Sequence, residues 1–168
     1  MRAHVSVASN IQPEHHVPQA LTRLAGVCTI LRVSPFYRTE PIGRPEQEAY
    51  WNGVALVEVE EAPVAFQFET LRGIEAELGR VRTEDAYAAR TIDLDLLTWG
   101  EAVVEQSGLH LPDPEVLERP FLARCLLDLD PGMIWPGTQQ QLAELVDLAE
   151  ETFERVARAE DVWAEGGG

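Results

Sequence analysis

The chain has 168 residues, of which 45% are hydrophobic and 25% are charged, so it fits a single globular domain that can bury its own core. Its formal net charge of −16 comes from 29 acidic and 13 basic residues, which argues against general binding to nucleic acids or anionic membranes. All 13 basic residues are arginines, and the absence of lysine excludes lysine-based phosphate clamps and Schiff bases.

The sequence also indicates where the protein works. No apolar run approaches the length of a membrane span, and the N-terminus lacks the apolar segment of a signal peptide. Cys28 and Cys125 lie in apolar surroundings without the spacing of a metal site. We therefore expect a cytoplasmic protein with reduced thiols, and we expect it to be monomeric.

The first part of the chain predicts a strand, a helix and two more strands. The alternation of apolar residues and the positions of proline and glycine indicate where these elements begin and end. The predicted elements are a strand over 3–9, a helix over Pro13–Leu24, a long strand over 28–38 and a strand over Trp51–Val59, with a polar loop over Glu40–Ala49.

The second part of the chain predicts a strong amphipathic helix followed by an irregular stretch and a strand. The helix covers Pro63–Leu78, with an apolar stripe formed by Phe66, Leu71, Ile74 and Leu78. The remaining predicted elements are an irregular polar stretch over Arg80–Ala89, a strand around Asp93 and Asp95, one or two short helices over Asp113–Leu127, and an acidic helix over Leu142–Ala159.

This order of elements predicts an α+β protein. A β-α-β-β-α-β core with extra C-terminal helices is the ferredoxin-like arrangement, in which an antiparallel sheet carries its helices on one face. Loops on the open side would build the functional site. Residues 1–163 form one domain in this interpretation, and residues 164–168 form a flexible tail.

The segment Arg90-Thr-Ile-Asp93-Leu-Asp95-Leu-Leu97 is the most informative part of the sequence. Side chains of a strand alternate between its two faces, so Asp93 and Asp95 point one way, with Cα atoms about 7 Å apart. Two carboxylates at this distance repel each other unless a cation lies between them, which suits hard divalent ions. Arg90 adds a charge of the kind that binds phosphate. The alternative is a half-exposed edge strand whose acidic residues face water.

Other positive charges gather close to this segment. Arg72, Arg80, Arg82 and Arg90 lie within 19 residues. The sequence contains neither a P-loop nor a Gly-x-Gly-x-x-Gly motif, so a bound nucleotide would not use either glycine-rich cradle. These arginines could alternatively form salt bridges with the many nearby acidic residues.

Three separated segments together resemble a known enzyme family. The first segment is 34–43 (Ser-Pro-Phe-Tyr-Arg-Thr-Glu-Pro-Ile-Gly) together with Tyr50-Trp-Asn52. The second is Gly79-Arg-Val-Arg82 together with residues 90–97. The third is Pro112 to Phe121. Their order and spacing are similar to those of the 6-hydroxymethyl-7,8-dihydropterin pyrophosphokinases of folate biosynthesis, over roughly residues 3 to 135. The resemblance implies transfer of pyrophosphate from ATP to the hydroxymethyl group of a reduced pterin, which releases AMP.

The resemblance also implies roles for individual residues. Asp93 and Asp95 would hold two Mg²⁺ ions, with Arg80 and Arg90 as further catalytic residues. The residues implied in ATP binding are Arg80, Arg82, Arg90 and Arg119. The residues implied in pterin binding are Thr39, Ile42, Tyr50, Asn52, Tyr87 and Phe121, where Phe121 would stack on the ring and Asn52 would bond its pyrimidine edge.

The sequence departs from the family pattern at Ala8-Ser-Asn10, where the family usually has Gly-Ser-Asn, and in two further places. Tyr87-Ala-Ala-Arg90 replaces a Trp-Gly-Pro-Arg-like run, and Asp113 replaces a common histidine. These departures leave open a catalytically weak or altered-substrate relative that binds a pterin or nucleotide. A ferredoxin-like domain whose acidic face docks a basic partner is a further alternative.

Overall fold

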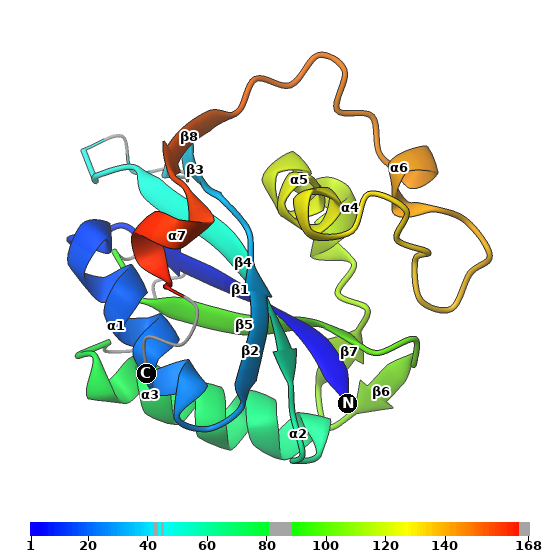
Figure 1. Ribbon diagram of the computed structural model, residues 1–168, viewed down its shortest axis with the longest axis horizontal. Helices are drawn as coiled ribbons and strands as arrows, with labels where there is room; N and C mark the ends of the chain where they lie inside the picture. The colour runs from blue at the N-terminus through cyan, green and yellow to red at the C-terminus, as the bar shows by residue number, and fades with distance from the viewer. Residues whose placement is uncertain (42–43, 45, 81–88, 165–168) are drawn as a thin grey trace.

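An antiparallel sheet forms the centre of the protein (Figure 1). The computed structural model describes residues 1–41, 44, 46–80 and 89–164. Within these residues the sheet has six strands, in the order β5-β1-β4-β3-β8, and β2 also pairs with β4. The strands are β1 (Arg2–Ser9), β2 (Thr29–Val33), β3 (Phe36–Thr39), β4 (Tyr50–Glu58), β5 (Asp93–Trp99) and β8 (Glu154–Ala157). The predicted α+β class and antiparallel sheet are confirmed.

β2 and β3 share one edge of β4, where the sequence predicted one long strand over 28–38. The strand breaks at Ser34–Pro35, because proline has no N–H to donate to the ladder. Ser34 bridges the gap: its N–H donates to the carbonyl of Val54 at 2.9 Å, and its hydroxyl accepts the N–H of Val54 at 2.9 Å. The chain therefore stays on the edge of β4 and places Thr39 beside Tyr50.

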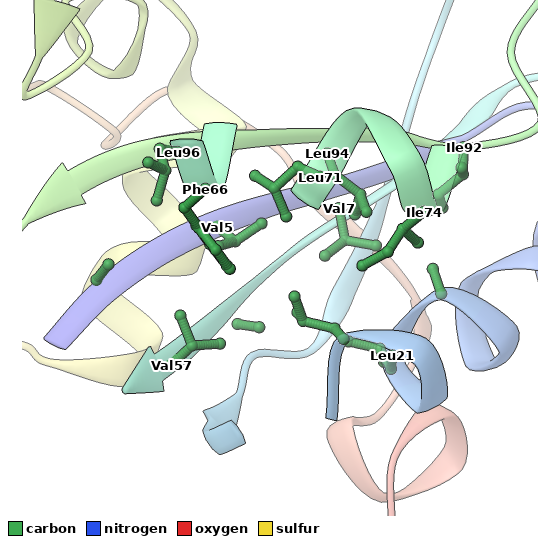
Figure 2. Close-up of a cluster of buried hydrophobic side chains, with 14 of the residues drawn as sticks. Val5, Val7, Leu21, Val57, Phe66, Leu71, Ile74, Ile92, Leu94 and Leu96 are labelled. Atoms are coloured by element: carbon green, nitrogen blue, oxygen red, sulfur yellow. The ribbon is translucent and has the colours of Figure 1, made fainter. Parts of the chain in front are cut away.

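One face of the sheet is covered by helix α1 (Pro13–Ala25) and by the helical run α2 (Pro63–Ala65), η1 (Phe66–Leu71) and α3 (Arg72–Glu77) (Figure 1). Alternate residues of β1 and β5 meet these helices in the main hydrophobic core. Full burial stabilises each large aliphatic or aromatic side chain by roughly 1.5–3 kcal/mol. Figure 2 shows the central members of this core, Val5, Val7, Leu21, Val57, Phe66, Leu71, Ile74, Ile92, Leu94 and Leu96.

The predicted helix over Pro63–Leu78 is confirmed, but its middle part, η1, is a π-helix. Phe66 and Leu71 are five residues apart, and both are fully buried. In an α-helix they would point about 140° apart. The i→i+5 hydrogen bonds of a π turn instead bring residues five apart onto the same face, so the stripe can stay on the core.

The opposite face of the sheet carries α4 (Glu115–Glu118) and α5 (Pro120–Leu129), which belong to the extra helices predicted after the core (Figure 1). α5 packs Leu122 and Leu126 against Val54 and Leu97, which form a second core with their neighbours. The one or two short helices predicted over Asp113–Leu127 are thus two helices that meet at Arg119–Pro120. Because α5 covers only part of this face, the ends of β1, β4 and β5 remain open beside it.

The predicted acidic helix over Leu142–Ala159 is wrong. The structure has a short helix α6 (Leu142–Leu145), an extended segment, the strand β8 and a short helix α7 (Ala159–Val162). A helix over this stretch would stack Asp147, Glu150 and Glu151 on adjacent turns, where like charges repel. β8 instead pairs with β3, and Phe153 packs edge-on against Tyr37 at a ring distance of 5.8 Å. Tertiary pairing therefore overrides the local helical pattern.

A small hairpin was not predicted. It consists of β6 (Val104–Gln106) and β7 (Leu109–Leu111), and its turn residues Ser107 and Gly108 have φ values of 49° and 81°. Positive φ at both positions is typical of tight hairpin turns, so this Ser-Gly pair was a usable signal. Across the described residues, no helix is both long enough and apolar enough to span a membrane.

Candidate active site

A cavity of about 800 Å³ opens on the second face of the sheet, where α5 leaves it uncovered. β1, β3, β4, β5 and the start of α5 contribute its walls. The predicted site residues that line it are Thr39, Tyr50, Asn52, Arg90, Asp93, Asp95, Arg119 and Phe121. The structure therefore brings together three groups of residues, over 39–52, 90–95 and 119–121, that lie apart in the sequence.

The register of the sheet explains this meeting. Ala8 of β1 is paired with Asp93 of β5 on one side and with Asn52 of β4 on the other. Residues paired across strands share a face, so these three side chains form one row across the sheet. Adjacent strands lie about 4.8 Å apart, which places Asp93 and Asn52 on opposite sides of a small alanine. The short side chain of Ala8 leaves room for a ligand between the acid and the amide.

The alternation predicted for β5 is confirmed. Asp93 and Asp95 both line the cavity, while Leu94 and Leu96 are buried in the main core on the other face. Asp95 is paired with Ser6 of β1, two residues along from Ala8. The two carboxylates therefore stand next to each other on the cavity side of an edge strand.

Both carboxylate oxygens of Asp93 accept hydrogen bonds from arginines. Arg80 Nη1 donates to Oδ1 at 2.7 Å, and Arg90 Nη1 donates to Oδ2 at 2.6 Å. Burial by itself raises the pKa of Asp93, but the charges and hydrogen bonds of Arg80 and Arg90 outweigh it and lower the pKa. Asp93 is therefore an ionised carboxylate that is held from two sides.

Asp95 has different partners, and the sequence did not indicate them. Gln67 Nε2 and Arg72 Nη2 each donate to its Oδ1 at 2.9 Å. Burial, and then the charge of Asp93, raise the pKa of Asp95 to about 6, although Arg72 and Gln67 oppose this rise. The pKa values of the two aspartates thus move in opposite directions because one acid has two arginines and the other has one.

The outer edge of β5 is capped by side chains in place of another strand. Gln67 Oε1 accepts the N–H of Leu96 at 2.8 Å, and Glu75 Oε2 accepts the N–H of Leu94 at 2.8 Å. Arg72 Nη1 donates to the carbonyl of Leu94 at 2.9 Å. Unpaired backbone groups of an edge strand would otherwise be exposed, so the helical run both satisfies the edge and supports the acids that the strand carries.

Glu75 anchors this arrangement. Its side chain is 2% exposed, and its Oε2 accepts hydrogen bonds from Nη1 of Arg72 and from Nη1 of Arg80, both at 3.0 Å. A buried acid needs such partners, because an uncompensated charge in the interior is costly. Glu75 therefore fixes the two arginines that reach Asp95 and Asp93. The sequence offered one signal, an acidic residue on a helix next to the apolar stripe.

Asn10 supports Arg90 from the end of β1. It is buried, its Oδ1 accepts the N–H of Arg90 at 2.7 Å, and its own N–H donates to the carbonyl of Arg90 at 3.1 Å. Its Nδ2 donates to Gln47 Oε1 at 3.1 Å. The backbone of Arg90 is therefore tied to the β1–α1 corner and, through it, to the loop after β3.

The donor set suits a magnesium ion. Asp93 and Asp95 supply hard carboxylate oxygens, and the described residues contain no group of three or more His, Cys, Asp or Glu side chains that could hold a metal ion. Magnesium characteristically uses one or two carboxylates and takes its remaining ligands from water and substrate phosphates. Within the described residues, the site therefore fits an ion that takes part of its ligands from a phosphate.

Uncharged side chains from β3, β4 and α5 line another part of the cavity, which we call the neutral half. Asn52 is 5% exposed and donates from Nδ2 to Thr39 Oγ1 at 2.6 Å, which fixes the orientation of its amide. Burial raises the pKa of Tyr50, so its phenol stays neutral and able to donate. Phe121 stands in the first turn of α5 on the cavity wall. These groups form an aromatic-walled slot with a fixed amide edge.

The remaining predicted residues are less well placed. Arg119 lines the cavity and forms a loose ion pair with Glu115 at 3.6 Å, with 43% of its side chain exposed. Asp113 accepts the N–H of Glu115 at 2.9 Å and so caps the turn that leads into α4. Ile42, Arg82 and Tyr87, as well as the tail from residue 165, lie outside the described residues.

Comparisons with known proteins agree with this geometry. The family model for 7,8-dihydro-6-hydroxymethylpterin-pyrophosphokinase (HPPK) matches residues 4–131. A 2-amino-4-hydroxy-6-hydroxymethyldihydropteridine pyrophosphokinase of Pseudomonas aeruginosa is 33% identical over 160 residues, which cover 94% of this chain and 96% of the relative. A similar enzyme of Synechocystis is 32% identical over 151 residues, with 88% and 76% covered.

Longer proteins also match. The folic acid synthesis protein fol1 of Schizosaccharomyces pombe is 34% identical over 149 residues, which cover 86% of this chain but 20% of the fungal protein. The chain likewise spans 15% of the length of fol1 from Pneumocystis carinii. The chain thus corresponds to a fraction of these fungal proteins.

A solved structure shows the same fold. The crystal structure of Plasmodium falciparum HPPK-DHPS with pterin and p-hydroxybenzoate matches with a TM-score of 0.64 at 11% identity, and the match covers 86% of this chain and 41% of that one. An acidic interaction domain unrelated to these enzymes is not favoured. The chain belongs to the 7,8-dihydro-6-hydroxymethylpterin-pyrophosphokinase family.

Proposed function

We propose that this protein transfers pyrophosphate from ATP to the hydroxymethyl group of 6-hydroxymethyl-7,8-dihydropterin, with release of AMP, in folate biosynthesis. One observation supports this most strongly. A charged half with two carboxylates and Arg90, and a neutral half with Asn52 and Phe121, open into the same cavity. The family match over residues 4–131 names the pair of substrates that such a cavity would join.

The transfer forms one P–O bond and breaks another. The hydroxymethyl oxygen of the pterin forms a bond to the β-phosphorus of ATP, and the bond between this phosphorus and the bridging α–β oxygen breaks. AMP leaves with the electron pair of that bond, and the hydroxyl proton is released to water. Little covalent chemistry falls to the protein in such a transfer, so positioning and charge compensation are its main contributions.

Asp93 and Asp95 would hold the two Mg²⁺ ions of this reaction. Bound Mg²⁺ neutralises phosphate charge and aligns the attacking hydroxyl with the bond that breaks. Asp93 accepts one arginine hydrogen bond on each oxygen, and the second lone pair of each oxygen can still face an ion. Arg90 lines the cavity and is the better placed of the two to turn from Asp93 toward a phosphate oxygen.

Arg80 serves a different part of the site in this proposal. Its side chain is 8% exposed and its Nη1 is shared by Glu75, Asp93 and the carbonyl of Ile92. Its first contribution is therefore to hold Asp93, and a phosphate contact requires the other nitrogens of its guanidinium. Arg119, at the mouth, together with Arg82, completes the set of cations proposed for ATP.

The pterin occupies the neutral half. Asn52 presents its amide oxygen and nitrogen to the pyrimidine edge. The hydrogen bond from its Nδ2 to Thr39 fixes the orientation of the amide group. Phe121 stacks on one face of the ring, with Tyr50 nearby. Ile42 and Tyr87 are assigned to the same slot by the family resemblance.

The wider assignments are also part of the proposal. The strand order β5-β1-β4-β3 supports a ferredoxin-like core. We assign residues 1–163 to one domain. We assign the protein to the cytoplasm as a monomer that acts on small molecules and not on nucleic acids or membranes, and its net charge of −16 supports the exclusion of polyanions.

An omission assay tests the proposed activity. AMP is measured by chromatography after incubation with ATP, Mg²⁺ and 6-hydroxymethyl-7,8-dihydropterin, and then with each component left out in turn. We expect AMP at a rate that depends on all three components. AMP formation that proceeds equally well without the pterin would identify a hydrolase and contradict the proposal.

A further inference from the structure

We propose that Gln67 and Arg72 are positioning residues that aim the carboxylate of Asp95 at a metal ion. The inference rests on the proposed function, because it concerns the cation that accompanies ATP. Neither residue lines the cavity, and each acts through Asp95. Glu75 has a different role, because it contacts Arg72 and Arg80 and acts on Asp95 through Arg72.

The contacts converge on one atom. Gln67 Nε2 and Arg72 Nη2 both donate to Oδ1 of Asp95 at 2.9 Å. Among the described residues these are the donors to this carboxylate, so Oδ2 is left for another partner. A carboxylate fixed through one oxygen offers the other in a defined direction, which is the geometry of a monodentate ligand.

Both helper side chains are themselves held by the backbone on either side of Asp95. Gln67 Oε1 accepts the N–H of Leu96 at 2.8 Å. Arg72 Nη1 donates to the carbonyl of Leu94 at 2.9 Å. Each helper therefore bonds the aspartate and the residue next to it in the strand. The side chain of Asp95 is consequently fixed relative to its own backbone and cannot turn freely into the cavity.

The π turn is what allows two side chains to reach the same oxygen. Gln67 and Arg72 are five residues apart in the run that contains η1 (Phe66–Leu71). On an α-helix they would diverge by about 140°, and one of them would face away from β5. The i→i+5 geometry places them on a common face. The same turn keeps Phe66 and Leu71 in the core, so a single irregularity serves both packing and the site.

Positioning and simple charge effects predict opposite signs at Arg72. If its guanidinium only repels cations, then removing its charge strengthens metal binding at Asp95. If it positions Oδ2, then removing it weakens metal binding even though a positive charge is lost. Gln67 is neutral, so its removal takes no positive charge from the site and acts through the lost hydrogen bonds to Asp95 and to the N–H of Leu96. Variants of Arg72 and Gln67 together therefore distinguish positioning of Asp95 from simple repulsion of the cation.

The test measures Mn²⁺ binding in place of turnover. Electron paramagnetic resonance of free Mn²⁺ gives its affinity for the whole protein in the presence of α,β-methylene ATP, in which the scissile bridge cannot break. We expect Gln67→Leu and Arg72→Met each to weaken Mn²⁺ binding by about tenfold or more, as is typical when a partner of a metal ligand is removed. The pterin affinity, measured by calorimetry, is expected to stay unchanged.

A control variant comes from the same turn. Thr70 donates to Glu61 at 2.8 Å and has no contact with Asp95, so Thr70→Val removes a hydrogen bond of η1 that points elsewhere. We expect it to leave Mn²⁺ binding unchanged. Gln67→Met repeats the test with a flexible side chain if the leucine variant does not fold.

Two results would overturn the inference. Tighter Mn²⁺ binding by Arg72→Met would show that Arg72 acts through charge, and wild-type affinity in the Gln67 variants would show that Gln67 only caps the strand edge. A wild-type protein that binds no Mn²⁺ with the nucleotide would remove the proposed function as well. This last outcome is read from the wild type alone and is thus distinct from a failure at Gln67 or Arg72.

Discussion

The two halves of the cavity are built in different ways. The charged half lies at the edge of the sheet, where Asp95 depends on side chains from the neighbouring helical run and Asp93 depends on Arg80, which follows that run, and on Arg90. The neutral half lies in the middle of the sheet, where Asn52 and Thr39 are neighbours on paired strands. The charged half is therefore a connected network, while the neutral half is a set of separate contacts on a rigid support.

This difference has consequences for mutations. In a network with shared partners, removing one member leaves buried charges without compensation, so effects on activity and stability appear together and do not add. In the neutral half, a substitution removes a contact with the ligand and leaves the fold intact. The following predictions test whether the two halves behave in these two ways.

The largest effect is expected when either of the acids proposed to bind metal is removed. Asp93→Ala and Asp95→Ala should each lower kcat by about 1,000-fold, because several kcal/mol of charge stabilisation are lost and each 1.36 kcal/mol is tenfold in rate. Steady-state AMP formation measures the loss. Asp161→Ala changes a remote acid that is paired with Arg158 and should be fully active. Near wild-type turnover in either site variant would remove the two-metal interpretation.

A smaller loss is expected when the anchor of the charged network is removed. Glu75→Ala leaves Arg72 and Arg80 without their buried partner and should reduce the free energy of unfolding by about 3 kcal/mol. Urea denaturation measures the change. Glu69→Ala, an exposed acid on the same helical run, is the control. An unfolding free energy equal to that of the control would mean that the arginines do not need Glu75.

The neutral half should respond through binding alone. Asn52→Ala should weaken pterin binding by about 1–3 kcal/mol, because ligand groups are left without a hydrogen-bond partner. The affinity for an ATP analogue, measured by calorimetry on the same variant, serves as the internal control and should not change. Equal losses for both ligands would place Asn52 in the structural framework and not in the pterin slot.

The last prediction concerns acid stability away from the site, where no effect on activity is expected. Burial lowers the pKa of His4 to about 4 despite the charge of Asp130, and the Thr98 hydroxyl lies 2.8 Å from its Nδ1. The unfolded chain therefore takes up a proton below pH 6.5 that the folded protein resists until about pH 4. Stability should fall as the pH drops through this window.

Thermal unfolding at several pH values between 4 and 7 measures this contribution of His4. His4→Gln should flatten the dependence in this range, and His15→Gln, at an exposed position of α1, should not. If both variants follow the wild-type curve, the acid sensitivity comes from other groups.

Some elements of this structure could be predicted from the sequence because they depend on the local periodicity of apolar residues. The alternation of Asp93 and Asp95 with apolar neighbours placed both acids on one face, and the apolar stripe located the helix that ends near Leu78. The strand over Trp51–Val59 was located by the same alternation. These features follow from the geometry of a single strand or helix and need no knowledge of the neighbours.

Other parts depend on pairings that the sequence does not display. Gln67 and Glu75 are ordinary helical residues until β5 lies beside them, so their role at its edge could not be inferred. The acidic stretch from Leu142 became strand β8 because β3 offered an open edge. The π turn left one signal, the five-residue spacing of Phe66 and Leu71, which fits no α-helical stripe. The assignments of Ile42, Arg82 and Tyr87 stay predictions.

The central claim is that one cavity joins ATP to the pterin for transfer of an intact pyrophosphoryl group. The most direct measurement uses ATP labelled with ³²P at the β position in one reaction and at the γ position in another, with 6-hydroxymethyl-7,8-dihydropterin as acceptor. We predict that both labels appear in the pterin product and that one AMP forms for each product molecule. Label from the γ position alone, with release of ADP, would show transfer of a single phosphate and would contradict the account.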